Sequence, residues 1–315
     1  MKKWSLTSLI ILVVVALLAA CSTEGPESAA GSGGGNESAP AGGKVTIGLS
    51  ISTQNNPFFV TLKEGAEKAA EAAGAELIVV DAQDDSAKQI SDIEDLIAKK
   101  VNVILINPTD GDAVVTAVES ANNANIPVIT VDRSANGGTV AAHIASDNVK
   151  GGEMAGEYIL KAIGGKGKIV ELQGTAGTSA ARDRGEGFHK AVDGKDGVEV
   201  AASQPADFDR AKGLSVMENI LQSNSDIQAV FAHNDEMALG ALQAIEAAGK
   251  KGIIVVGFDA TADAVAAVEN GAMAATIAQK PEEIGKIAVE TAVKVSAGEK
   301  VESNIPVELE LVTKQ

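Results

Sequence analysis

The sequence predicts an α/β fold of two similar domains, each a doubly wound parallel sheet. Short, β-branched apolar runs alternate with segments of helical periodicity along the chain from residue 44 onward. The runs are apolar on both faces, which is typical of parallel strands covered by helices on either side. There are more such runs than one doubly wound sheet usually holds, and 315 residues are enough for two domains.

The elements follow from the periodicity, two for strands and 3.6 for helices. The expected strands are 45–51, 76–80, 102–106, 127–131, 140–144, 167–171, 197–202, 228–232, 253–257, 273–277 and 306–312. Amphipathic helices are expected over 58–73, 87–99, 110–123, 148–163, 179–192, 210–222, 235–248 and 281–296.

The N-terminal segment is typical of a secretory signal. Lys2 and Lys3 precede an apolar run over 9–18, and the four residues that end at Cys21, the chain's one cysteine, resemble a bacterial lipobox. The pattern predicts a signal peptide over 1–20 and a lipid on Cys21. The alternatives are a membrane-spanning anchor, for which the run is short, and a plain signal peptide with a chance cysteine. The Gly- and Ser-rich composition of 21–43 predicts a flexible tether.

Charge and motif content narrow the function. A formal net charge of −17 argues against binding to nucleic acid, which needs clustered Lys and Arg. The sequence has no phosphate-binding loop, nucleophile elbow or dinucleotide fingerprint, and its three histidines are not at metal-ligand spacing. We therefore expect no cofactor, no metal and no enzymatic activity.

One strand-to-helix junction has the features of a ligand site. Pro57 suits the first position of a helix, and Asn56 then falls where an N-cap belongs. Phe58 and Phe59 follow in the first turn, at the carboxyl end of a strand, where open α/β sheets bind ligands. An amide beside two rings suits a sugar, which has apolar faces and polar edges. The alternative is that both rings are core packing.

The two halves of the chain repeat a pattern of polar residues. Asn107 and Asn234 are 127 residues apart, and so are Asp132 and Asp259. Each follows an expected strand. One interpretation is that these Asn and Asp residues are simply caps that follow strands. The repeated spacing instead favours two similar domains whose strand ends face one cleft.

The polar and planar side chains at strand ends or in loops suit a neutral sugar. Carboxylates accept from hydroxyls, guanidinium groups donate and amides do both. Equal numbers of acids and arginines limit the cost of burial. Asp132 and Arg133 alternatively form a structural ion pair. The set is Asn56, Asn107, Asp132, Arg133, Arg184, Asn234, Asp259 and Gln279.

From residue 44 to 315 the chain resembles the bacterial D-ribose-binding proteins of ABC importers. The resemblance is carried by Asn55-Asn-Pro-Phe-Phe59, Leu105-Ile-Asn-Pro-Thr-Asp110, Ile126-Pro-Val-Ile-Thr-Val-Asp-Arg133, His143-Ile-Ala-Ser-Asp-Asn148, Gly177-Thr-Ser-Ala-Ala-Arg182, Arg184-Gly-Glu-Gly-Phe188, Ser203-Gln-Pro-Ala-Asp-Phe-Asp-Arg210, Asn234-Asp-Glu-Met-Ala-Leu-Gly240 and Thr276-Ile-Ala-Gln279.

The resemblance implies a type I periplasmic-binding-protein clamshell with a hinge of three crossings, near 145–147, 278–280 and 307–309. It implies an N-terminal domain of 44–146 plus 280–308 and a C-terminal domain of 147–279 plus 309–315. It implies sugar contacts from Asn56, Phe58, Phe59, Asn107, Asp132 and Arg133 in the first domain, from Arg184, Phe208, Asn234 and Asp259 in the second, and from Gln279 at a crossing, with Phe258 in the pocket wall.

The expected function is therefore a monomeric receptor that captures D-ribose by hinge closure and delivers it to an ABC permease. The lipobox favours anchoring of the receptor at the extracellular face of the cell membrane. A receptor for allose, xylose or a furanose signal is the alternative within this class. A secreted carbohydrate-active enzyme would need paired carboxylates, and a transcription regulator of similar fold would need an N-terminal DNA-binding motif. The sequence leaves open whether a chemotaxis receptor is a further partner.

Overall fold

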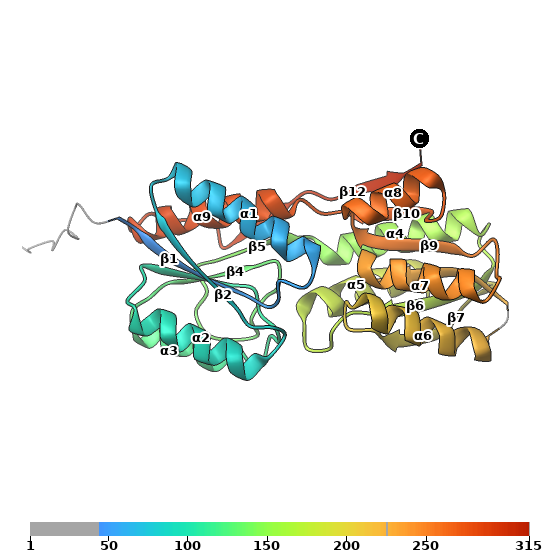
Figure 1. Ribbon diagram of the computed structural model, residues 1–315, viewed down its shortest axis with the longest axis horizontal. Coiled ribbons are helices and arrows are strands. Elements are labelled where there is room, and N and C mark those ends of the chain that lie inside the picture. Colours follow the sequence, from blue (N-terminus) through green and yellow to red (C-terminus); the bar gives the residue numbers. More distant parts are fainter. Residues whose placement is uncertain (1–43, 225, 315) are drawn as a thin grey trace, which may run out of the picture. The chain divides into compact units, whose positions relative to one another are not determined.

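The computed structural model describes residues 44–224 and 226–314, which form two six-stranded sheets (Figure 1). The strand order is β11-β5-β4-β3-β1-β2 in the first sheet and β12-β10-β9-β8-β6-β7 in the second. Every strand pair is parallel except β10 with β12. The predicted α/β class with two parallel sheets is confirmed.

Each sheet and its helices are called a lobe below. The first lobe contains β1 (Thr46–Ile51), α1 (Pro57–Ala72), β2 (Glu76–Asp81), α2 (Ser86–Ala98), β3 (Val103–Ile106), α3 (Val115–Asn123), β4 (Val128–Val131), β5 (Ala142–Ser146), α9 (Pro281–Ser296) and β11 (Asn304–Val307). The second contains α4 (Asn148–Ala162), β6 (Gly167–Gln173), α5 (Ser179–Val192), β7 (Val198–Pro205), α6 (Arg210–Ser223), β8 (Ile227–Ala232), α7 (Asp235–Ala247), β9 (Ile254–Asp259), α8 (Ala262–Asn270), β10 (Ala275–Ala278) and β12 (Glu310–Thr313).

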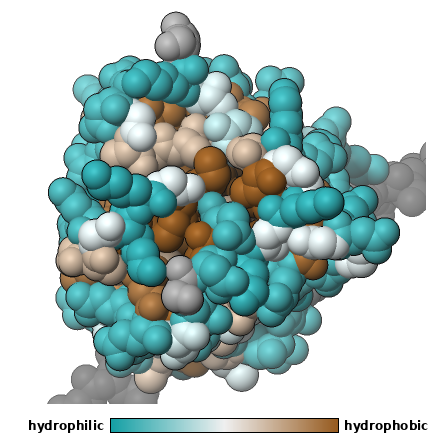
Figure 2. Space-filling model, turned by 90° about the vertical axis from the view of Figure 1, so that its right-hand side faces the viewer, coloured by the Kyte–Doolittle hydropathy of each residue, from teal (hydrophilic) through white to brown (hydrophobic). Residues whose placement is uncertain are grey.

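Each sheet has a hydrophobic core on both faces, which explains why its central strands are wholly apolar. In the first lobe, α1 and α9 cover one face, and α2 and α3 cover the other (Figure 1). In the second lobe, α6, α7 and α8 cover one face, and α4 and α5 cover the other. On the end of this lobe seen in Figure 2, hydrophilic side chains surround smaller hydrophobic areas. Leu311, with 37% exposure, is the one exposed large hydrophobic residue in the described part of the chain.

The chain passes between the sheets at three places: after β5, after β10, and between β11 and β12. The expected single strand 306–312 is therefore wrong, because it divides into β11 and β12, which pair in different sheets. The expected helix at 110–123 begins at Val115 instead. Asp110 Oδ1 accepts from the N–H groups of Asp112 and Ala113, so a capped turn precedes the helix. Helix α8 was not among the expected helices.

Close helix packing places one part of the site. A Cβ on Gly152 of α4 would overlap the carbonyl oxygen of Arg184, and a Cβ on Gly187 of α5 would overlap that of Val149. The two helices can therefore approach backbone to backbone, which brings Arg184 next to the start of α4. In the described range no helix is long and apolar enough to cross a membrane.

Candidate functional site

The junction between β1 and α1 is built as its sequence predicts. Asn56 has an extended backbone, and its Oδ1 accepts the Phe58 N–H at 2.9 Å, while Pro57 occupies the first helical turn. The cap fixes the direction in which the first turn points. The rings of Phe58 and Phe59 lie edge to face, with centroids 5.2 Å apart, and both are buried.

The repeated Asn and Asp positions fall at equivalent places in the two sheets. Asn107 follows β3 and Asp132 follows β4, whereas Asn234 precedes α7 and Asp259 ends β9. Both aspartates have positive φ, 63° for Asp132 and 118° for Asp259. Residues other than glycine rarely adopt this backbone conformation. Strain of this kind is maintained only by surrounding contacts and is common at functional sites.

The two asparagines support neighbouring site residues. Asn107 Nδ2 donates to the Val131 carbonyl at 3.1 Å and to Asp132 Oδ2 at 3.2 Å, so it holds Asp132 from behind. Asn234 caps α7 through the Met237 N–H and donates to the Phe208 carbonyl at 3.2 Å. Asn234 therefore ties the loop of Phe208 to the start of a helix.

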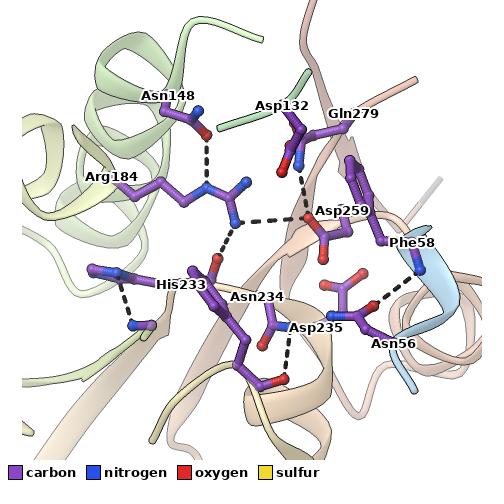
Figure 3. A network of polar contacts seen from close by, with 12 residues as sticks. Asn56, Phe58, Asp132, Asn148, Arg184, His233, Asn234, Asp235, Asp259 and Gln279 are labelled. Atoms are coloured by element: carbon purple, nitrogen blue, oxygen red, sulfur yellow. Dashed lines mark hydrogen bonds and ion pairs between the residues drawn. The ribbon is translucent and has the colours of Figure 1, made fainter. Parts of the chain in front are cut away.

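Side chains from both lobes line one small pocket (Figure 3). The lining residues are Asn56, Phe58, Phe59, Asp132, Arg133, Ala180, Arg184, Phe208, Asn234, Asp259 and Gln279. Of the expected ligand residues, Asn107 and Phe258 do not line this pocket. Ala180, at the start of α5, was not expected, because an alanine near a helix terminus carries no sequence signal of its own.

Two buried arginines, Arg133 and Arg184, line the pocket, and the guanidinium group of each packs against aromatic rings. The guanidinium carbon of Arg133 lies 5.1 Å from the ring centroid of Phe59 and 5.2 Å from that of Phe208. The corresponding carbon of Arg184 lies 3.8 Å from the centroid of Phe258, which explains why Phe258 sits behind the pocket. Stacking of this kind fixes the plane of the guanidinium fork.

Arg184 is further fixed by two residues that the sequence did not single out. Its Nε donates to Asn148 Oδ1 at 2.8 Å, and its Nη1 donates to the His233 carbonyl at 2.6 Å (Figure 3). Nη1 also lies 3.7 Å from Asp259 Oδ1. Asn148 begins α4, so the close packing of α4 on α5 is what places these groups together.

Burial sets the charge properties of the pocket. It raises the pKa of Asp132 and Asp259, although the arginines nearby oppose the shift. It lowers the pKa of Arg133 and Arg184, which the aspartates oppose. Arg133 Nε lies 3.8 Å from Asp132 Oδ2, which is too far for a hydrogen bond. The ion pair therefore leaves hydrogen-bonding capacity on both side chains.

Three polar atoms of the pocket residues are buried without a hydrogen-bond partner in the described part of the chain. They are Asp132 Oδ1, Arg133 Nε and Gln279 Oε1. Two are acceptors and one is a donor. An unpartnered buried polar group costs about 1–3 kcal/mol, so these atoms favour a ligand that both donates and accepts hydrogen bonds. No group of three or more potential metal ligands is placed to hold an ion within 44–224 and 226–314.

A buried carboxylate beneath the second lobe's half of the site forms a separate network. Glu171 Oε1 accepts from His233 Nε2 at 2.9 Å, and Oε2 bonds to Ser203 and His189. His233 Nδ1 accepts the Gly174 N–H at 3.3 Å, so the ring proton is on Nε2. Burial alone would raise the pKa of Glu171, but the hydrogen bonds from His233 and Ser203, with His189 nearby, lower it to about 2.

We expect Glu171→Gln to remove an acid-sensitive part of the stability. The folded pKa of Glu171, about 2, lies below its ordinary value of 4.5, so its contribution is present above pH 4.5 and is lost as the pH falls toward 2. The shift corresponds to roughly 3 kcal/mol at neutral pH. Denaturant unfolding at several pH values measures it, with Glu199→Gln on the exposed face of β7 as control. Equal pH slopes for wild type and Glu171→Gln would contradict this assignment.

Comparisons with known proteins agree with this architecture. The family model described as "Periplasmic binding protein domain" matches residues 47–300. The ribose import binding protein RbsB of Escherichia coli (strain K12) is 58% identical over 278 residues, which cover 88% of this chain and 94% of that protein. The protein of the same name from Bacillus subtilis (strain 168) is 56% identical over 270 residues, 86% of this chain and 88% of the relative.

Solved structures show the same fold. An ABC transporter solute binding protein from Mycobacterium smegmatis with bound glycerol has a TM-score of 0.84 at 38% identity, covering 86% of this chain and 95% of its own. An ABC transporter periplasmic solute binding protein from Actinobacillus succinogenes with bound D-allose has a TM-score of 0.81 at 33% identity, covering 86% and 98%. The family model and these similarities extend over both lobes, and the chain belongs to the family of proteins with a periplasmic binding protein domain.

Proposed function

We propose that this protein captures D-ribose between its two lobes and delivers it to the permease of an ABC importer. The observation that carries the proposal is the set of unpartnered atoms Asp132 Oδ1, Arg133 Nε and Gln279 Oε1 in a pocket walled by aromatic rings. Sugar hydroxyls each donate and accept, so one polyol can satisfy acceptors and donors together. The rings suit the apolar faces of a sugar.

The choice of ribose rests on the relatives named as ribose import binding proteins, at 55–58% identity. More distant structures of the same fold hold D-allose or myo-inositol, so the fold itself accommodates several polyols. The pocket is lined by two aspartates and two arginines, and this balance favours a neutral ligand over a sugar acid or sugar phosphate. The receptor role leaves the sugar chemically unchanged, with Asp132 and Asp259 as hydroxyl acceptors.

Titration calorimetry with a panel of D-ribose, D-allose, D-xylose and D-galactose tests the ligand. We expect D-ribose to bind most tightly, to raise the melting temperature, and to be recovered intact. Tighter binding of another sugar would assign the receptor to that sugar. Hydrolysis or isomerisation of the bound sugar would show that the protein is an enzyme and not a receptor.

The proposal includes closure of the lobes around the sugar. The site residues come from both lobes, so neither lobe completes the hydrogen-bond shell alone. A ligand that contacts both lobes stabilises the closed form by its differential affinity for that form. The rotation belongs to the three connections that follow β5, β10 and β11. Small-angle scattering measures it as a smaller radius of gyration with saturating ribose, and superimposable curves would argue against closure.

We also propose that Cys21 carries a lipid that holds the receptor at the extracellular face of the cell membrane. Residues 1–43, including this cysteine, lie outside the described residues, so the support is the lipobox-like sequence alone. Cys21→Ala is expected to move the protein from the membrane fraction to the soluble fraction or to block its processing. Cys21→Ser, which also lacks the thiol, is the matched variant. Unchanged membrane partition of both would exclude this anchor.

A further inference from the structure

The turn that carries Asp259 has an unusual backbone. Asp259 and Ala260 are consecutive, and their φ values are 118° and 55°. L-amino acids rarely adopt this region, and they remain there only where the surrounding structure over-determines the conformation. Specific contacts must therefore stabilise this turn.

Two hydroxyls and one carboxylate hold it. The Thr261 N–H donates to Asp235 Oδ2 at 2.7 Å, and the Thr261 hydroxyl donates to the same oxygen at 3.2 Å. The Ala260 N–H donates to Thr276 Oγ1 at 3.2 Å, and the Thr276 hydroxyl in turn donates to Asp235 Oδ1 at 2.7 Å. Both oxygens of Asp235 are thus tied to the two residues that follow Asp259, one directly and the other through Thr276.

Asp235 itself lies outside the pocket. It is fully buried and is not among the pocket-lining residues, although it directly follows Asn234, which is. As the first residue of α7, Asp235 directly follows the capping residue Asn234. Gly257 of β9 leaves the space it needs, because a Cβ there would overlap Asp235 Oδ1. In the sheet Gly257 is paired with Thr276, so the carboxylate lies over that pair of residues.

We propose that Asp235 is a positioning residue for sugar binding: it fixes the turn at 259–261, in which Asp259 and Ala260 have positive φ, and so directs the Asp259 carboxylate into the pocket. The proposal rests on the proposed sugar-receptor function. Asp259 Oδ1 accepts from Gln279 Nε2 at 2.9 Å and lies 3.7 Å from Arg184 Nη1, so a displaced turn would disturb three pocket residues together.

Four variants separate this role from a general contribution to folding. Asp235→Ala removes both oxygens, and Thr276→Val removes only the hydroxyl between Asp235 and the Ala260 N–H. Asp235→Asn keeps an oxygen for Thr261 and offers an N–H to Thr276. Glu236→Gln, the next residue of α7, is the control, because Glu236 bonds Arg210 and makes none of these contacts with the turn.

Burial raises the pKa of Asp235 to about 7, against hydrogen bonds from Thr276 and Thr261. Near neutral pH part of the Asp235 population is therefore a protonated carboxylic acid. The asparagine amide of Asp235→Asn resembles this form, because each has one acceptor oxygen and a hydrogen-bond donor. Ribose affinity is measured by calorimetry well below each variant's melting temperature. We expect losses of about tenfold or more for Asp235→Ala and about threefold to tenfold for Thr276→Val, whereas Asp235→Asn and Glu236→Gln stay within about threefold.

A double-mutant cycle with Asp259→Asn completes the test. If Asp235 acts through Asp259, adding Asp235→Ala to Asp259→Asn weakens binding by less than about threefold. Independent, multiplying losses would overturn the proposal, as would a lowered melting temperature with unchanged affinity. If Asp235→Ala does not fold, Thr276→Val takes its place in the cycle with the same two outcomes. Wild-type binding of ribose is the reference, and its failure would refute the proposed function rather than this role.

Discussion

Arg133→Ala is expected to weaken ribose binding about thirtyfold or more while the protein still folds. Arg133 is held between the rings of Phe59 and Phe208, and its Nε has no hydrogen-bond partner in the described chain. The donor is therefore in place before the sugar arrives, and little ordering entropy is lost on binding. Truncating one member of a buried, charged hydrogen-bond pair costs about 2–5 kcal/mol, roughly thirtyfold to several thousandfold in affinity.

The alanine variant also leaves Asp132 buried with weaker compensation, so its ligand-free melting temperature should fall. Arg133→Lys keeps the charge but lacks the planar fork, and we expect an intermediate loss of affinity. Arg182→Ala is the control, because Arg182 is an exposed arginine whose ion pair is with its neighbour Asp183. Calorimetry on all three variants measures the effect. A dissociation constant for Arg133→Ala within threefold of wild type would remove Arg133 from the site.

Asp259→Ala is expected to cause a loss of similar size from the opposite lobe. Asp259 accepts from Gln279 and is the carboxylate nearest to Arg184, so its removal leaves a buried guanidinium with one fewer counter-charge. The same range of about 2–5 kcal/mol applies. Asp263→Ala is the control, because Asp263 is 68% exposed in its side chain and pairs with Arg210 on the surface. Equal affinity of Asp259→Ala and Asp263→Ala for ribose would contradict the role of Asp259.

The pH dependence of unfolding gives Asp259→Ala a second readout. The pKa of Asp259 is raised by burial, with the charge of Arg184 opposing, so ionisation destabilises the ligand-free fold. The protonated Asp259 carboxyl therefore stabilises the fold fully below pH 3.8, the ordinary pKa of an aspartate. This stabilisation is lost as the pH rises through the raised pKa of Asp259 in the folded protein. Asp259→Ala should flatten this part of the pH profile of ligand-free unfolding. Asp263→Ala should retain it.

Much of the fold and part of the site could be predicted because they depend on short stretches of chain. Apolar β-branched runs between amphipathic segments specify parallel strands with helices on both faces, whatever their neighbours. The cap of α1 requires only Asn56, Pro57 and the Phe58 N–H, all within three residues. Asn107, Asp132, Asn234 and Asp259 each follow an apolar run, and their equal spacing of 127 residues relates the strand ends of the two halves.

Other features depend on partners far along the chain. The alternating run 306–312 has the pattern of one strand but divides between two sheets, because its first part pairs with β5 and its last part with β10. Asn107 was expected in the pocket, yet its amide is occupied by the Val131 carbonyl and Asp132. Phe258 lies behind Arg184, because the guanidinium stacks on its ring.

The sequence by itself determined the class of fold, the strand ends that carry polar groups and the neutral, polyol-like character of the ligand. Only the tertiary structure decided which of those groups face the pocket and which support them. Asp235 is the clearest example, because its partners Thr261 and Thr276 are 26 and 41 residues away. Local propensity is encoded residue by residue, whereas the direction of a buried side chain depends on donors and acceptors that only folding brings together.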